Sequence, residues 1–134
     1  MTKIIAPHGA DELKPLFVYD ARENERLQHE ARSLPSIVVS SAAAANAVMM
    51  GAGYFTPLTG YMGKADALSV GDKMVMKNGL FWPVPILNLV KSAGTIKPGD
   101  RIALKDPNVE GNPVLAIMDV QAVETFSDDE LKKL

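Results

Sequence analysis

Apolar residues recur with a helical period in the first third of the chain. Between residues 27 and 34 they stand at intervals of four and three positions, which places them on one face of a helix. Asp20 and Glu23 have the spacing of a capping box at the start of this helix, and Pro35 would end it. The β-branched run 37–39 that follows favours a short buried strand.

Two further short helices are expected before the pattern changes. The run 42–50 contains four consecutive alanines, which have strong helix propensity and little bulk, and Ser40 or Ser41 can cap it. A helix over 64–70 would end at Gly71. The small side chains of 42–50 would allow a neighbouring element to approach that helix closely.

The second half of the chain changes to a period of two, which is typical of strands. Asn78-Gly79 separates two such segments and predicts a hairpin with a type I′ turn. Pro83 and Pro85 lack a backbone N–H, so the segment that they occupy must be an edge or the beginning of a strand. Further strands are expected over 86–90, 102–104 and 114–125.

The order of these elements predicts an α+β fold, in which short helices are followed by an antiparallel, barrel-like sheet. Ser127 and Glu130 form a second capping-box pattern, which would start a final helix. We therefore expect one domain over residues 1–126 and the beginning of a linker helix over 127–134.

Charge and composition exclude several classes of protein. A net charge of −2, with lysines and arginines scattered along 134 residues, argues against a surface built for phosphate backbones, so we expect no nucleic-acid partner. No apolar run reaches the roughly 18 residues that a membrane span needs, and the N-terminus lacks the long apolar stretch of a signal peptide. Without cysteine there is no disulfide framework. A cytoplasmic protein without a membrane partner is the simplest expectation.

Few residues could carry chemistry. His8 and His29 are far apart and have no further ligands at fitting intervals, so no metal site is predicted, and His8 is expected to hydrogen-bond a turn. Trp82 stands between Phe81 and Pro83 and could be a platform on which a nucleic-acid base stacks. A core position beside the hairpin is the alternative interpretation of Trp82, and we favour it.

The stretch GAGYFTPLTGYMG, from Gly51 to Gly63, concentrates glycines and aromatics without any residue that usually transfers protons or binds metals. We interpret it as a connector between two helices, called the Gly51–Gly63 connector below. Pro57 and Gly60 would set a turn in it, and the apolar side chains beneath would pack into the core; these are Phe55, Leu58, Tyr61 and Met62.

Six segments together resemble the N-terminal domain of ATP sulfurylase (sulfate adenylyltransferase). In chain order they are PHG (7–9), LPSIVVS (34–40), GAGYFTPLTGYMG (51–63), NGLFWPVPILNLV (78–90), GDRIALKDP (99–107) and GNPVLAIMDV (111–120). The resemblance covers nearly the whole chain and implies a barrel of the PUA-like class. Thr56 and Tyr61 replace the serine and phenylalanine that the family usually has.

The resemblance also implies where the chemistry lies. In the family, a separate catalytic domain follows this one, and its Q-x-R-N and H-x-x-H motifs bind ATP phosphates and sulfate. Neither motif occurs here, so no catalytic, substrate-binding or metal residue is carried over onto this sequence. Magnesium would accompany ATP in the full enzyme, and this chain would hold no cofactor.

The expected partner is therefore the catalytic domain of the same enzyme, with a homo-oligomer as a further possibility. The alternatives are a free-standing PUA-like module that binds RNA and a purely structural or oligomerising domain. The candidates for structural or interdomain roles are His8, Phe55, Pro57, Leu58, Gly60, Tyr61, Met62 and Trp82.

Overall fold

Three strands form an open, mixed sheet in the computed structural model, which describes residues 5–134. β1 (Ser36–Val38) runs parallel to β2 (Arg101–Lys105), and β2 runs antiparallel to β3 (Val114–Asp119). The expected antiparallel barrel is therefore not what the described residues form. Two helices lie between β1 and β2 in the chain, and this long crossover lets the two strands pair in parallel.

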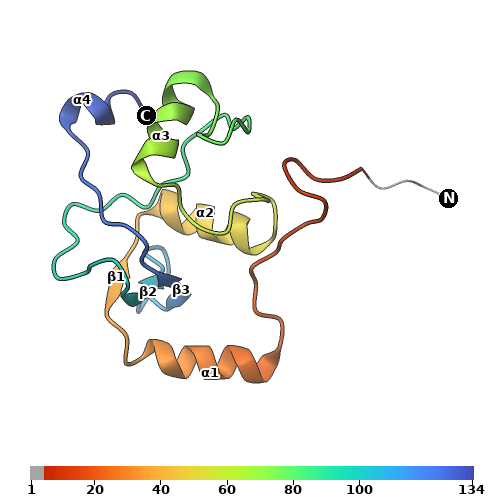
Figure 1. Cartoon of the computed structure of the whole chain (residues 1–134). Helices are drawn as coiled ribbons and strands as arrows, with labels where there is room; N and C mark the ends of the chain where they lie inside the picture. The colour runs from red at the N-terminus through yellow and green to blue at the C-terminus, as the bar shows by residue number, and fades with distance from the viewer. Residues whose placement is uncertain (1–4) are drawn as a thin grey trace.

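Four helices accompany the sheet in the described part of the chain (Figure 1). They are α1 (Ala21–Ala31), α2 (Ser41–Gly51), α3 (Lys64–Lys73) and α4 (Asp128–Leu131). α1 and α2 both contact β3, and Figure 1 shows the sheet between them, with α3 and α4 together at the other end of the molecule. The fold is thus a small α+β arrangement, as the sequence predicts.

The helix starts follow the local signals in the sequence. The side chains of Asp20 and Ser40 each accept a hydrogen bond from the backbone N–H three residues on. The capping box of Ser127 and Glu130 is complete, because each side chain accepts from the other residue's backbone N–H. At Asp20 the box is only half formed, since the Glu23 carboxylate pairs with the guanidinium of Arg26 instead.

Two sequence expectations about ends and turns are wrong. α3 continues past Gly71 to Lys73 and is closed by Met74, which has a left-handed φ of 56° and donates its N–H to Val70. The hairpin at Asn78-Gly79 does form, with Val75 opposite Phe81. Its turn is not type I′, because only the glycine has a positive φ, at 91°.

The strand expected over 86–90 is not formed, because this segment belongs to no helix or strand. Ile86 is buried, and its carbonyl oxygen accepts a hydrogen bond from the N–H of Met62 at 2.7 Å. Its partner is therefore the connector and not another strand. β3 also ends earlier than expected, at Asp119, although Val120 remains buried.

The buried apolar side chains form two clusters. The first, the Trp82 cluster, fills the space under the Gly51–Gly63 connector and α3; its members are Met50, Leu58, Met62, Ala67, Val70, Trp82 and Ile86. The second, the sheet cluster, lies between α2 and the sheet; its members are Val39, Ala43, Ala44, Ile102, Leu104 and Val120. Ala43 is fully buried, which fits the expected close approach to the alanine-rich helix.

Candidate functional site

The Gly51–Gly63 connector leaves α2 in a series of tight turns. Gly53 adopts a φ of +84°, and the Thr56–Pro57 peptide bond is cis. Thr56 is 5% exposed; its hydroxyl donates to the carbonyl oxygen of Gly53 and accepts from the N–H of Lys14. The connector is therefore fastened both to itself and to the segment that precedes α1.

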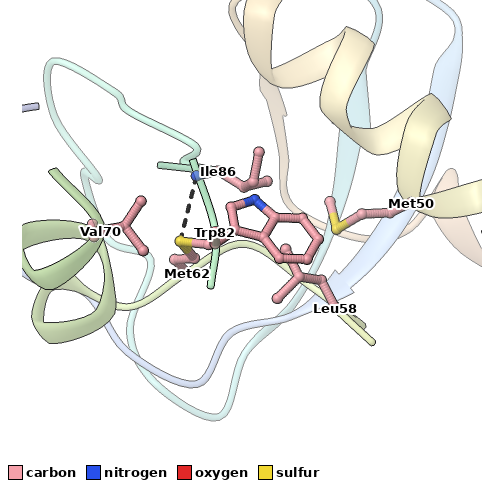
Figure 2. Packing of buried hydrophobic residues seen from close by; sticks show 7 residues of the cluster. Met50, Leu58, Met62, Val70, Trp82 and Ile86 are labelled. Atoms are coloured by element: carbon pink, nitrogen blue, oxygen red, sulfur yellow. Dashed lines mark hydrogen bonds between the residues drawn. The ribbon is translucent and has the colours of Figure 1, made fainter. Parts of the chain in front are cut away.

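The apolar side chains of the connector point into the Trp82 cluster (Figure 2). Leu58 and Met62 are each 8% exposed, and the indole of Trp82 is 7% exposed. Phe55 is half-buried and stands edge-on to Trp82, with 5.8 Å between the ring centroids. Trp82 is thus a core residue, which is the interpretation that the sequence favours, and its ring has no open face for a base.

Two hydrogen bonds join Met62 and Ile86. Besides the backbone hydrogen bond described above, the N–H of Ile86 points at the Sδ atom of Met62 at 3.5 Å, the contact drawn dashed in Figure 2. A thioether is a weak acceptor, so it satisfies a buried donor that would otherwise be unpaired. This pairing joins the connector to the extended segment after the hairpin.

Tyr61 connects the two clusters. Its ring packs against both of them, and its hydroxyl donates a hydrogen bond of 2.6 Å to the carbonyl oxygen of Ala43. Burial raises the pKa of Tyr61 to about 12, because the charged phenolate would lose its hydration. The hydroxyl is therefore a donor at neutral pH and not a proton acceptor in catalysis.

His8 attaches the N-terminal segment to the hairpin. Its Nε2 donates to the carbonyl oxygen of Phe81 at 2.7 Å, and its ring lies 6.1 Å from that of Trp82, centroid to centroid. The imidazole itself is exposed. The neighbouring Gly9 has a φ of +69°, and a side chain there would meet Leu80.

Pro57 and Gly60 differ in their surroundings. Pro57 is half-buried within the turns, whereas Gly60 lies after them and is exposed. A Cβ atom on Gly60 would have open space, and its φ lies outside the left-handed region. Of the eight candidates, the structure brings His8, Phe55, Leu58, Met62 and Trp82 together, places Tyr61 beside them, and leaves Gly60 apart.

This arrangement is suited to packing and not to acid–base chemistry. Among residues 5–134 no three His, Asp or Glu side chains lie close enough to hold a metal ion. Two shallow hollows, of about 450 and 530 Å³, follow residues 5–14 and include neither His8 nor any aromatic residue of the candidate set. The site consists of apolar side chains, backbone hydrogen bonds and the half-buried phenol of Tyr61.

Comparison with known proteins agrees with this fold. The family model described as a PUA-like domain matches residues 5–133. The chain belongs to this family.

The relatives of this PUA-like domain are named sulfate adenylyltransferase. The protein of Alcanivorax borkumensis is 61% identical over 98% of this chain, and that of Allochromatium vinosum is 59% identical over 96%. The chain spans 33% and 32% of these two proteins, matching their N-terminal region. It therefore corresponds to about a third of a longer polypeptide in both organisms.

A solved structure shows the same arrangement. A chain described as "Hexameric APS kinase from Thiobacillus denitrificans" superposes on 93% of this PUA-like domain with a TM-score of 0.74 and 31% sequence identity. The match again uses only part of the other molecule, 24% of that chain. In the described residues of this domain, no helix is both long and apolar enough to cross a membrane.

Several ion pairs of the PUA-like domain cannot be predicted from the sequence. Lys64 forms an ion pair of 2.9 Å with Glu130, and Arg101 pairs with both Glu30 and Asp119. These partners are far apart in sequence and follow no local spacing. The capping-box pattern predicts that Glu130 lies at a helix start, but it does not predict the ion pair with Lys64.

Proposed function

We propose that this PUA-like domain is the N-terminal accessory part of a sulfate adenylyltransferase and supports a catalytic portion that lies outside this chain. In such an enzyme ATP and sulfate give adenylyl sulfate and pyrophosphate, with magnesium on the nucleotide. The observation that carries the proposal is the 61% identity over 98% of the chain to a protein of which it spans 33%.

The side chains of the described residues support this division of labour. Binding ATP phosphates and sulfate requires a cradle of cationic side chains and backbone N–H groups directed at the oxygens. The connector instead directs Phe55, Leu58 and Met62 into the core. Among residues 5–134, no three His, Asp or Glu side chains come together, so the proposal assigns the magnesium that accompanies ATP to the catalytic portion.

The same proposal gives roles to the parts of the chain. Residues up to 126 form the accessory domain, and 127–134 begin the passage towards the catalytic portion. His8, Phe55, Pro57, Leu58, Gly60, Tyr61, Met62 and Trp82 serve the shape of the domain, which in turn supports the catalytic portion. A cytoplasmic location and a homo-oligomeric enzyme complete the proposal.

A chimaeric enzyme tests the proposal directly. The 134 residues would replace the matching N-terminal third of the Alcanivorax borkumensis protein, and ATP formation from adenylyl sulfate and pyrophosphate would be measured. We expect the chimaera to work at a rate close to that of the unmodified enzyme, and the remainder without either N-terminal third to be less stable. A folded but inactive chimaera would contradict the proposal.

The isolated chain provides the matching control. It should catalyse no adenylyl-sulfate-dependent exchange between ATP and pyrophosphate, and robust turnover by the purified chain would overturn the accessory role. RNA binding distinguishes the alternative module. We expect no RNA affinity beyond the nonspecific range, about 10⁻⁴ to 10⁻⁶ M at physiological salt, whereas a salt-sensitive nanomolar complex would favour that module.

A further inference from the structure

Several of the last eleven residues of the chain contact α3. At the beginning of this helix, the backbone N–H of Lys64 donates to the Glu124 carboxylate at 2.6 Å, and its Nζ donates to the carbonyl oxygen of Thr125 at 2.7 Å. The same ammonium group lies 5.6 Å from the centroid of the Phe126 ring and 2.9 Å from a carboxylate oxygen of Glu130. One lysine thus contacts four residues of the terminal segment.

Glu130 binds both Lys64 of α3 and the first turn of α4. One of its carboxylate oxygens pairs with Lys64, and the other accepts from the backbone N–H of Ser127, which closes the capping box. Both bonds favour the ionised form and lower the pKa of Glu130 to about 2. Because the same side chain caps α4 and binds α3, the two helices are held in a fixed relation.

Near the other end of α3, a glycine lies next to the same terminal segment. Gly71 lies inside the helix, where glycine is a poor helix former. A Cβ atom on Gly71 would stand only 2.5 Å from the carbonyl oxygen of Lys133, a backbone atom that cannot rotate away. The helix therefore has no side chain at the position where the terminal backbone crosses it, and Figure 1 shows the C-terminal residue beside α3.

We infer that α3 and residues 124–134 form a rigid joint that sets the direction in which the polypeptide passes from this domain to the catalytic portion. Lys64 and Gly71 are its positioning residues, one at each end of α3. The inference rests on the proposed function, since the partner is the remainder of a sulfate adenylyltransferase. The segment itself, with a capped helix and no glycine after residue 111, has none of the composition of a flexible linker.

Two substitutions disturb the joint in different ways. Gly71→Ala adds one methyl group against the Lys133 carbonyl and improves helix propensity, so it displaces the segment without weakening α3. Lys64→Met keeps an aliphatic side chain and removes the ion pair and the bond to Thr125. Asp72→Ala is the matched control, because it changes an exposed neighbour in the same helix.

Hydrogen exchange of the isolated chain gives the first readout. In both variants the amides of residues 130–134 should exchange about tenfold faster or more, while those of α2 remain protected, because only a local contact opens. Asp72→Ala should behave like the wild type. Unchanged exchange at 130–134 in both variants would overturn the inference, whatever the function of the chain.

The active chimaera described above gives the second readout. The chain has no cysteine, so Lys91→Cys provides one label site in this domain, paired with a label on the catalytic portion. The distance distribution between the labels should be narrow in the wild type and broad in Gly71→Ala and Lys64→Met. If the chimaera is active and its distance distribution stays narrow in both variants, the rigid joint is refuted and the proposed function stands. If the chimaera that carries the wild-type domain is inactive, the proposed function is refuted.

Discussion

The hydroxyl of Tyr61 donates to the carbonyl oxygen of Ala43 across 2.6 Å, which ties the connector to the first turn of α2. The phenol ring between them touches both the Trp82 cluster and the sheet cluster. The two clusters are therefore joined by a polar bond as well as by apolar contact. A phenylalanine at this position would provide only the apolar contact.

Tyr61→Phe tests the value of that bond. The substitution keeps the ring and removes the hydrogen bond from the hydroxyl to the Ala43 carbonyl, so the free energy of unfolding should fall by about 0.5 to 1.5 kcal/mol. Tyr54→Phe is the control, because the Tyr54 side chain is 74% exposed and should change stability by less than about 0.5 kcal/mol. Urea melts of both variants measure the difference. Equal, small effects would show that the hydrogen bond contributes nothing.

Phe55→Ala and Leu58→Ala test whether the connector is anchored in the core. Each should cost about 2 to 5 kcal/mol, through lost burial and a residual cavity, with half-buried Phe55 at the lower end. Thr59→Ala, at an exposed neighbouring position, is the control. Urea midpoints that correspond to less than about 0.5 kcal/mol for both core variants would contradict the structural role and indicate a binding loop.

Glycines of the connector should differ in their tolerance of a side chain. Gly53→Ala forces a left-handed φ of +84° on alanine and should cost about 1 to 2 kcal/mol. Gly60→Ala meets no neighbour and no unusual φ, so it should be neutral or stabilising by up to about 1 kcal/mol, because it restricts the unfolded chain. Thermal melts of the two variants decide this, and a similar loss in both would refute the distinction.

Acid should release the terminal segment. The pKa of Glu130 is lowered from 4.5 to about 2, first by the hydrogen bond from Lys64 and then by the N–H of Ser127. Because the folded value is the lower one, the ionised carboxylate stabilises the fold above about pH 4.5, and this contribution is lost as the pH falls towards 2.

The corresponding experiment compares the wild type with Glu130→Gln in urea melts from pH 7 to pH 2. The difference in midpoint should be constant above about pH 4.5, decrease below it and vanish near pH 2. Asp129→Asn provides the control, since the Asp129 side chain is 91% exposed. A difference that does not change with pH would show that the Lys64–Glu130 pair contributes no electrostatic stability.

The helix starts could be predicted from sequence because their causes are local. Ser40 and Ser127 cap helices through atoms three residues away, and such spacing is visible in the chain. The end of α3 cannot be predicted in this way, because its cause is not local. Gly71 reads as a helix stop, but it is needed where Lys133 crosses the helix, more than sixty positions later.

The sheet was predicted less well because strand partners are distant. The apolar run beginning at Ile86 is expected to be a strand, yet it joins no strand, and the Ile86 carbonyl oxygen accepts from the N–H of Met62 in the connector. Nothing in the spacing of residues shows that Ser36 lies opposite Ala103 in a parallel pair. The burial of Trp82, Leu58 and Met62 is easier to predict, because large apolar side chains usually enter the core whatever their partners are.

The parallel pairing of β1 with β2 has a consequence for biosynthesis. A ribosome releases Ser36–Val38 well before Arg101–Lys105, so β1 emerges without its neighbour. The buried members of the Trp82 cluster all lie between residues 50 and 86, so they are synthesised before β2, and only Phe126 of the side chains packed against them follows it. Non-local pairing forms slowly, and we expect a free chain truncated after residue 90 to protect Trp82 from quenching although it lacks β2 and β3. We therefore expect the residues around the connector to fold first and the three strands to pair last.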